Sequence, residues 1–184
     1  MLIFVSGGVR SGKSSFAEQY ACHLAEDTCI HYIATSTITD NEMKQRIQKH
    51  QNDRAASPYE WKTWEQPRNL ENIIPQFSIT DTVLIDCLTV WLSNELFIND
   101  IWQSAQQSAF VVRRMKETIE QYQKQCLHVI VVSNDLFYDG MPEDVGSKCY
   151  LSSLGKLHQE IVEIADEAYQ AEFGLVQAMK EGNS

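Results

Sequence analysis

A glycine-rich stretch near the start of the sequence has residue types that could bind phosphate. It runs from Gly7 to Ser14 and reads Gly-Gly-Val-Arg-Ser-Gly-Lys-Ser, the spacing G-x-x-x-x-G-K-S. Glycines let the backbone curl so that successive N–H groups point into one concavity, where phosphate oxygens can sit. Lys13 can reach the β- and γ-phosphates, and the Ser14 hydroxyl can ligate Mg²⁺. The stretch predicts a site for a nucleoside triphosphate; the alternative is an ordinary glycine turn.

A carboxylate later in the sequence could complete a metal site. Asp86 directly follows the strand-like run 82–85. In phosphate-loop proteins an aspartate at the end of such a strand meets Mg²⁺ directly or through water. The alternative is a simple aspartate at a turn. We expect Ser14 and Asp86 to hold Mg²⁺, and the whole glycine-rich loop to bind the nucleotide: Gly7, Gly8, Val9, Arg10, Ser11, Gly12, Lys13 and Ser14.

The elements that must position these residues alternate between strands and helices. Apolar runs predict strands over 2–5, 30–34, 59–65, 82–86, 128–133 and 168–179. Helical patterns cover 12–25, 39–54, 67–77, 88–97, 101–125 and 147–166. We expect the first helix to pack on the sheet through Phe16, Tyr20 and Leu24. The buried stripe of the long helix is predicted to comprise Ile101, Ala105, Ala109, Val112, Met115, Ile119 and Tyr122.

This alternation predicts an α/β fold of the P-loop NTPase-like kind, with a mostly parallel sheet and helices on both faces. At 184 residues the chain is expected to form a single nucleotide-binding transferase domain, 1–184. In such sheets the ligand lies beyond the carboxyl ends of the strands. The glycine-rich loop, Thr35, Asp86 and Asn134 are therefore expected to converge there.

Composition excludes several classes of function. The formal net charge of −10 argues against a nucleic-acid partner, because phosphates would be repelled. No apolar run approaches the length of a membrane span, and the short N-terminal run lacks the basic leader of a signal peptide. The five cysteines are scattered without C-x-x-C spacing. We read them as reduced thiols of a cytoplasmic protein.

His50 is the histidine whose surroundings could make it a nucleophile. Thr39 and Glu42 fit a capping box, and the helix that they open places His50 on an apolar face. Arg46 and Arg54 lie four residues to either side of it. A nucleophilic imidazole must be neutral, and neighbouring cations disfavour its protonation. The alternative is a buried histidine satisfied by a hydrogen bond.

Several further runs carry a family resemblance. The glycine-rich loop is followed by Tyr-Ile-Ala-Thr at 32–35 and by Asp-x-Glu-Met-x-x-Arg-Ile-x-x-His at 40–50. Trp-Lys-Thr-x-Glu-x-Pro at 61–67 and Leu-Ile-Asp-Cys-Leu-Thr-x-Trp-Leu-x-Asn at 84–94 continue the series. In this order the runs closely resemble the bifunctional adenosylcobinamide kinase/adenosylcobinamide-phosphate guanylyltransferase family. The likeness covers roughly residues 1 to 97 and resumes at 132–134.

The resemblance implies two reactions of cobalamin assembly. One phosphorylates adenosylcobinamide; the other transfers GMP from GTP to the product through a GMP–histidine intermediate, and the histidine maps to His50. GTP or ATP would be the nucleotide substrate, with Mg²⁺, and the family's association into trimers implies a homo-oligomer. Besides the loop, the implied guanine-nucleotide residues are Thr35, Ser36, Thr37, Gln51, Asn52, Asp53, Arg54, Glu65 and Asp86.

The sequence departs from the family pattern in its C-terminal part. The family's Asn-Glu-Val-Gly-x-Gly-Ile-Val-Pro is replaced at 134–142 by Asn-Asp-Leu-Phe-Tyr-Asp-Gly-Met-Pro, and a stretch that is arginine-rich in the family lacks those arginines. Two alternatives follow. One is a diverged relative that retains one transfer or uses another acceptor. The other is a nucleotide-binding module without turnover, against which a histidine in its full motif argues.

Overall fold

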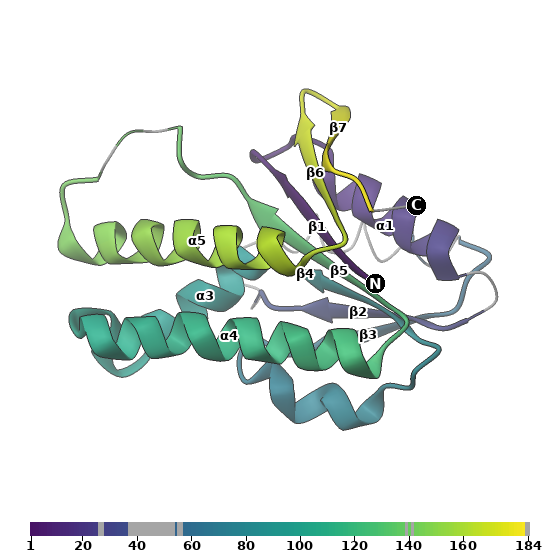
Figure 1. Cartoon of the computed structure of the whole chain (residues 1–184), viewed down its shortest axis with the longest axis horizontal. Coiled ribbons are helices and arrows are strands. Elements are labelled where there is room, and N and C mark those ends of the chain that lie inside the picture. The colour runs from purple at the N-terminus through teal and green to yellow at the C-terminus, as the bar shows by residue number, and fades with distance from the viewer. Residues whose placement is uncertain (26–27, 37–53, 55–56, 139, 141, 183–184) are drawn as a thin grey trace.

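The computed structural model describes all residues except 26–27, 37–53, 55–56, 139, 141 and 183–184. Its centre is a seven-stranded sheet in the order β3-β2-β4-β5-β1-β6-β7 (Figure 1). All neighbouring strands pair in parallel except β6 and β7, which are antiparallel. The predicted mostly parallel α/β fold is thus confirmed. The strands are β1 Leu2–Gly7, β2 Ile30–Ala34, β3 Trp61–Glu65, β4 Thr82–Asp86, β5 His128–Asn134, β6 Glu167–Glu172 and β7 Leu175–Lys180.

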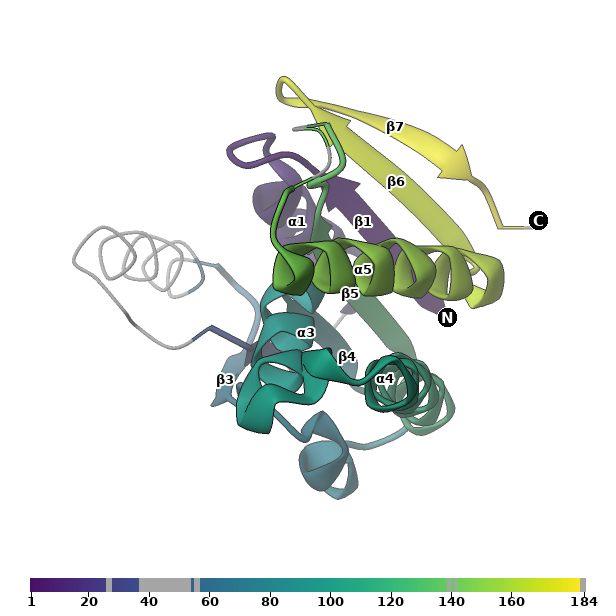
Figure 2. The ribbon, with the colours of Figure 1, turned by 90° about the vertical axis from the view of Figure 1, so that its left-hand side faces the viewer.

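Helices cover both faces of the sheet, as expected (Figures 1 and 2). Helices α3, α4 and α5 pack on one face and α1 packs on the other. Two short 3-10 helices, η1 and η2, join the first group. No helix in the described ranges is long and apolar enough to cross a membrane. The helices are α1 Lys13–Ala25, η1 Leu70–Gln76, α3 Leu88–Leu96, η2 Ile98–Gln103, α4 Ala105–Gln125 and α5 Val145–Ile164.

Strand β1 shows why the apolar runs of this sequence become central strands. Successive side chains of a strand point to opposite faces. Leu2 and Phe4 therefore enter the core under α3, α4 and α5, and Ile3 and Val5 enter the core under α1. All four are at most 3% exposed. A run without polar alternation is what a strand covered on both faces requires.

Helix α1 packs on the sheet through small residues. Ala17, Ala21 and Ala25 are at most 1% exposed, whereas Phe16 and Tyr20 are only partly buried. Phe16, Tyr20 and Leu24 do pack against this core, as predicted, but the alanines, which were not predicted, occupy the innermost positions. Alanines let the helix axis approach the sheet closely, and the rings then pack to the side, where Phe16 lies 5.1 Å from the ring of Tyr169.

Helix α4 begins later than predicted. Asn99 and Asp100 have positive φ angles of 50° and 55°, which interrupt η2, and α4 begins at Ala105 after the N-cap Ser104. Ile101 is therefore outside the long helix, and Ala105 and Ala109 are not among its buried residues. The predicted stripe is correct from the middle of the helix onward. Its buried residues are Ser108, Val111, Val112, Met115, Thr118, Ile119 and Tyr122.

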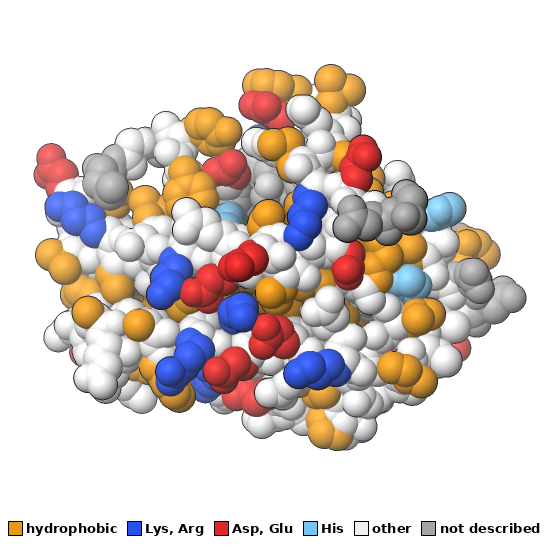
Figure 3. Space-filling view, in the orientation of Figure 1, with side chains coloured by type: hydrophobic (Ala, Val, Ile, Leu, Met, Phe, Trp, Pro, Cys, Tyr) orange, Lys and Arg blue, Asp and Glu red, His pale blue; other side chains and the backbone are white. Residues whose placement is uncertain are grey.

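The outer face of α4 and α5 carries charges of both signs. Figure 3 shows basic and acidic side chains interspersed across this face of the molecule. A spacing of four residues places two side chains on the same side of a helix, where opposite charges can pair. The pairs with this spacing are Arg113–Glu117, Lys116–Glu120 and Lys156–Glu160. The face shown is therefore a mixed-charge surface exposed to solvent.

The C-terminal segment folds as a hairpin, not as the single strand predicted over 168–179. Phe173 and Gly174, with φ angles of 50° and 80°, form the two-residue turn between β6 and β7. Two positive φ angles are what a turn matching the twist of a hairpin needs. The turn was missed because an apolar residue, Phe173, precedes Gly174, where Asn or Asp would have marked a hairpin turn.

The remaining predicted elements are found close to their predicted positions. The segment 67–77 contains the 3-10 helix η1 with Pro75 inside it, and α5 begins at Val145 after its N-cap Asp144. The predicted helix over 39–54 lies outside the described residues, apart from Arg54.

Candidate active site

The glycine-rich loop joins β1 to α1 and curls back on itself. The Ser11 N–H donates to the Gly8 carbonyl at 3.3 Å, and the Lys13 ammonium donates to the same oxygen at 3.0 Å. Arg10 and Gly12 have positive φ angles of 62° and 95°, which give the loop its tight curvature. A ring of backbone N–H groups next to a helix N-terminus is the geometry that binds phosphate.

Strand β6 and the hairpin turn support this loop from the side. A Cβ on Gly7 would lie 2.4 Å from the Ala171 carbonyl oxygen, so only glycine fits next to β6. The Gly174 N–H donates to the Ser11 carbonyl at 3.1 Å. The Ser11 hydroxyl is buried without a hydrogen-bond partner among the described residues. A polar atom left in this way inside a phosphate-binding loop suits a site whose partner is a ligand.

Lys13 is a buried cation that faces a carboxylate. It is only 8% exposed, and burial lowers its pKa, an effect that the charge of Asp86 opposes. Asp86 ends β4, two strands away from β1 in the sheet. Lys13 and Asp86 thus lie near each other where the parallel strands have their carboxyl ends, as the sequence predicted. We call this side of the sheet its carboxyl edge.

The carboxyl ends of β2 and β4 are joined by Thr35. Its hydroxyl donates to the Cys87 carbonyl and accepts from the Cys87 N–H, both at 2.8 Å, and its own N–H donates to the Asp86 carbonyl at 3.1 Å. Thr35 is fully buried, so its side chain holds the strand ends in register. Ser36, which follows it, is partly exposed.

A second set of contacts connects this region to β5 and α3. Asn134 ends β5 and donates to the Thr89 hydroxyl at 2.9 Å. The thiol of Cys87 lies 2.9 Å from the same hydroxyl, and burial raises the pKa of Cys87 to about 11, so the thiol is neutral. Thr35, Asp86 and Asn134 therefore converge, as predicted. Thr35 and Asn134 do not bond to each other directly; Cys87 and Thr89 lie between them.

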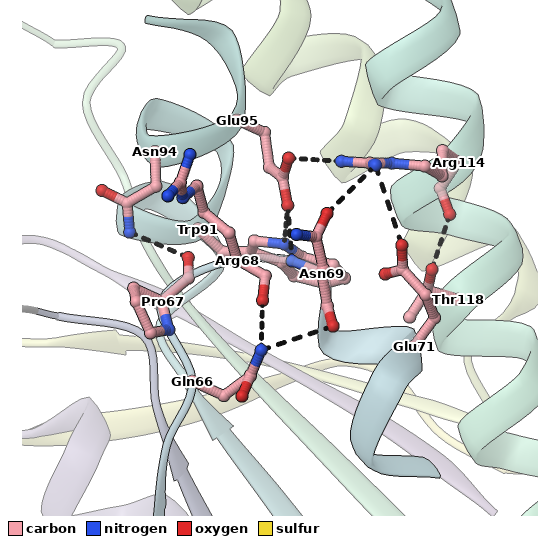
Figure 4. A network of polar contacts seen from close by, with 10 residues as sticks. All are labelled: Gln66, Pro67, Arg68, Asn69, Glu71, Trp91, Asn94, Glu95, Arg114 and Thr118. Carbon is pink, nitrogen blue, oxygen red and sulfur yellow. Dashed lines mark hydrogen bonds and ion pairs between the residues drawn. The ribbon is translucent and has the colours of Figure 1, made fainter. Parts of the chain in front are cut away.

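Asn94 of α3 ties the site to the segment after β3 (Figure 4). Its amide donates to the carbonyls of Thr35, at 2.9 Å, and Pro67, at 3.0 Å. Glu65, a predicted nucleotide residue, is exposed at the end of β3, opposite Ala34 in the register. Asn94 thus holds the ends of β2 and β3 together at the carboxyl edge.

Tyr32 and Arg54 form a wall of the site, and the role of Tyr32 in it was not predicted from the sequence. The Tyr32 hydroxyl donates to Asp86 Oδ2 at 3.0 Å, and the Arg54 guanidinium lies 3.9 Å from the centre of the Tyr32 ring. Arg54 also forms an ion pair with Glu18 of α1 at 2.7 Å. Burial, followed by the charge of Asp86, raises the pKa of Tyr32 well above its usual value, so its hydroxyl remains a donor.

Comparison with known proteins assigns the chain to a family. The family model described as "Cobinamide kinase / cobinamide phosphate guanyltransferase" matches residues 3–179. The chain belongs to this family. It is 31% identical over 182 residues to the "Bifunctional adenosylcobalamin biosynthesis protein CobU" of Salmonella typhimurium, covering 95% of this chain and 97% of that protein.

Relatives from other organisms match to a similar extent. The protein of the same name from Escherichia coli is 29% identical, covering 95% of this chain and 97% of that protein. The "Bifunctional adenosylcobalamin biosynthesis protein CobP" of Pseudomonas aeruginosa is 31% identical, covering 96% and 95%. Among solved structures, the flagellar accessory protein FlaH from Methanocaldococcus jannaschii has a TM-score of 0.42 and 16% identity, covering 98% of this chain and 78% of that one.

The donor set at the carboxyl edge fits the Mg²⁺ expected in a cobinamide kinase/guanyltransferase. Ser14, in the first turn of α1, and Asp86 offer hydroxyl and carboxylate oxygens, which are the ligands that Mg²⁺ prefers. No group of three or more His, Cys, Asp or Glu side chains that could hold a metal occurs among the described residues. Mg²⁺ commonly takes one or two protein ligands and completes its shell with phosphates and water.

The nucleophile and part of the nucleotide set expected from the family lie outside the described residues. These are Thr37, Arg46, His50, Gln51, Asn52 and Asp53. Arg54, which is described, has its guanidinium bound to Glu18 and Tyr32. Sequence reasoning missed Tyr32, Cys87, Thr89 and Asn94, although all four lie in the runs that carry the family resemblance. Their roles depend on which strands are neighbours, which the sequence does not state.

Proposed function

We propose that this protein phosphorylates adenosylcobinamide and transfers GMP from GTP to the resulting phosphate, giving adenosylcobinamide-GDP in cobalamin biosynthesis. The observation that carries the proposal is the family match over 3–179, in a chain whose phosphate loop, Lys13 and Asp86 lie at one edge of the sheet. The bifunctional names of the relatives support both transfers.

In this proposal the phosphate loop and Lys13 bind the triphosphate and keep its charge compensated. Mg²⁺, held by Ser14 and Asp86, would neutralise charge on the phosphates. The remaining nucleotide contacts come from residues 35–37, 51–54 and Glu65. The Thr35 hydroxyl is already hydrogen-bonded to the backbone of Cys87. Thr35 would therefore support the nucleotide site indirectly, by holding the backbone next to Asp86 in place.

For guanylyl transfer we propose His50 as the nucleophile. A neutral imidazole nitrogen attacks the α-phosphorus of GTP; a P–N bond forms, the bond to the bridging oxygen breaks, and pyrophosphate leaves. A phosphate oxygen of the acceptor then attacks the same phosphorus, the P–N bond breaks, and the histidine is regenerated. Atoms and charge therefore balance without any further reactant.

A diverged relative with only one of the two transfers is the second candidate. It is favoured by the changed loop 134–142 and by the missing arginines of α5, which alter the part of the chain expected to serve the acceptor. We further propose that the protein is cytoplasmic and forms a homotrimer; light scattering of the purified protein would test the oligomeric state.

Labelled GTP distinguishes these possibilities. With α-labelled GTP and Mg²⁺, the wild type should acquire a covalent label that is labile in acid and stable in base, as a phosphoramidate is. His50→Ala should lose the label but still bind nucleotide. With γ-labelled GTP or ATP and adenosylcobinamide, label should appear in the corrinoid. A label that persists in His50→Ala would reject this nucleophile, and a wild type without either label would reject the proposed function.

A further inference from the structure

Tyr32 occupies a position that links two parts of the site. It lies in the middle of β2, between β3 and β4 in the sheet. Its hydroxyl reaches Asp86 at the end of β4, and its ring face carries the guanidinium of Arg54. By contrast, the buried hydroxyl of Tyr122 donates to the backbone carbonyl of Leu70 and simply closes a core contact. One side chain of β2 therefore touches both an acidic and a basic residue of the site.

The contact with Asp86 restricts the orientation of a carboxylate. A donor fixed on Oδ2 at 3.0 Å limits rotation of the carboxyl group about its last bond. The carboxylate also attracts the buried ammonium of Lys13. Partners that orient a ligand carboxylate in this way typically change metal affinity about 10- to 100-fold when they are removed.

The second contact of Tyr32 holds the side chain of Arg54. A guanidinium 3.9 Å from a ring centre is within the range of a cation–π interaction, and Trp61 adds a second ring at 5.8 Å. Glu18 compensates the charge of Arg54 from the side of α1. Arg54 is 7% exposed and follows the segment 37–53 directly in the sequence. That segment contains His50.

We propose that Tyr32 is a positioning residue with two separable roles. Its hydroxyl orients Asp86 toward the Mg²⁺ of the bound nucleotide, and its ring holds Arg54, which follows His50 by four residues in the sequence. This inference rests on the proposed function for the chemistry, and it adds a residue outside the expected nucleotide and metal sets.

The first test removes only the hydroxyl. In Tyr32→Phe, the Mg²⁺ concentration needed for half-maximal binding of a fluorescent GDP analogue should rise about 10-fold, while binding in EDTA should match the wild type. Tyr169→Phe is the matched control, because Tyr169 also donates to a carboxylate at 3.0 Å, that of Glu167, away from Asp86. The control should keep the Mg²⁺ dependence of the wild type.

A double-mutant cycle separates orientation from a general loss of stability. If Tyr32 acts through Asp86, Tyr32→Phe should change the Mg²⁺ dependence much less in an Asp86→Asn background than in the wild type. Equal effects in both backgrounds would overturn the first role. The measurement is GDP binding, so it does not depend on turnover. It is made at a temperature at which melting curves show that every variant is folded.

The second test addresses the ring. Arg54→Met combined with Glu18→Gln removes the cation without leaving a buried carboxylate unpaired. Because Arg54 belongs to the expected nucleotide set, the double variant should bind GDP more weakly at every Mg²⁺ concentration, without a change in the Mg²⁺ concentration needed for half-maximal binding. At saturating GTP it should acquire the GMP label about 10-fold more slowly, the size of effect typical of lost positioning. Tyr32→Phe, at saturating Mg²⁺, should label at the wild-type rate because its ring remains. Unchanged labelling in the double variant would overturn the second role.

These outcomes also separate the inference from the proposed function. A wild type that binds GDP with Mg²⁺ while Tyr32→Phe keeps its Mg²⁺ dependence rejects the role of the hydroxyl alone. A wild type that binds no nucleotide at all rejects both the inference and the proposed function.

Discussion

Lys13 shows how a charged residue is kept available inside the protein. Its ammonium is nearly buried and donates to a carbonyl of its own loop, Gly8. Burial disfavours the charged form and lowers the pKa of Lys13. A bound phosphate carries the negative charge that the loop carbonyl lacks. It would therefore stabilise the Lys13 ammonium more strongly than the Gly8 carbonyl does.

Replacing Lys13 by methionine should therefore damage binding more than folding. A hydrogen bond to a charged group contributes about 1.5–3 kcal/mol, so the dissociation constant for GDP should rise about 10- to 100-fold. The melting temperature should not fall, because a buried ammonium is removed. Fluorescence titration and thermal melting measure the two effects. Lys116→Met, which removes an ammonium paired with Glu120 on α4, is the control and should leave affinity unchanged; equal losses in both variants would contradict a phosphate contact.

His158 makes the stability of the fold sensitive to acid. Its Nε2 lies 2.7 Å from the buried Ser133 hydroxyl, and its ring contacts Phe4 and Phe137. Burial lowers the pKa of His158 from 6.5 to about 4, an effect that Asp135 opposes. Between these two values the unfolded chain binds more protons than the folded one. The stability that neutral His158 permits is thus complete above pH 6.5 and is lost as the pH falls toward 4.

The loss across this window should be about 3 kcal/mol, and urea unfolding at about pH 7 and pH 4.5 would measure most of it. The variant with His158→Phe and Ser133→Ala keeps an aromatic ring and leaves no hydroxyl unpaired. It should lose clearly less stability between the two pH values than the wild type does. His23→Gln, at an exposed position of α1, should behave like the wild type. The assignment to His158 is wrong if the double variant is as acid-sensitive as the wild type.

At the scale of elements, a polar network fixes α3 and α4 to the segment after β3 (Figure 4). Its centre is Glu95, which is 4% exposed and accepts from the Asn69 N–H at 2.9 Å and the Trp91 indole at 3.1 Å. Arg114 of α4 forms an ion pair with the same carboxylate and lies 3.7 Å from Glu71. A buried carboxylate of this kind depends on all its donors, because any loss leaves charge in a dry environment.

Two neighbouring arginines of α4 test this dependence. Arg114→Met should lower the free energy of unfolding by about 2–3 kcal/mol, since it leaves Glu95 without its cation. Arg113→Met removes an exposed arginine 3.9 Å from Glu117 and should change stability by less than about 0.5 kcal/mol. Urea denaturation of both variants gives the comparison. Similar values for the two would show that the network contributes no more than a surface pair.

Local sequence was sufficient where one element decides the outcome. The runs that become β1, β4 and β5 are largely apolar, and the spacing from Gly7 to Ser14 marks the loop between β1 and α1 by residue type alone. Lys13 and Asp86 were predicted from local patterns of the same kind.

Prediction failed where tertiary packing decides. The start of α4 depends on the left-handed conformations of Asn99 and Asp100, which no pattern marks. Tyr32 resembled a core residue of a short strand. Its contacts with Asp86 and Arg54 depend on the pairing of β2 with β4 and on the position of Arg54, which the sequence alone does not give.

At the scale of the whole molecule, β1 is held between two strands from the far end of the chain. Leu2 pairs with Val129 of β5, and Ile3 pairs with Glu167 of β6. In the turn after β6, the Gly174 N–H also donates to the Ser11 carbonyl of the glycine-rich loop. Strand β7, by contrast, is almost entirely exposed.

Two truncations should therefore differ sharply. Removal of 167–184 takes away β6, leaves one edge of β1 unpaired and uncovers apolar surface, so the product should aggregate and bind no nucleotide. Removal of 175–184 takes away only β7 and should preserve GDP binding, since β6 and Gly174 remain. Gel filtration and fluorescence titration would compare them. Nucleotide binding by the chain that lacks 167–184 would show that β6 is dispensable.

The position of β1 also bears on how the protein forms during synthesis. Strand β1, which leads into the glycine-rich loop, leaves the ribosome before its partners β5 and β6, which are made much later. Contacts between residues far apart in sequence close slowly, because the entropy of a long loop is lost before they form. This part of the nascent chain must therefore wait, apolar and unpaired, until both partners have been translated. That interval is when chaperones would matter most to this protein.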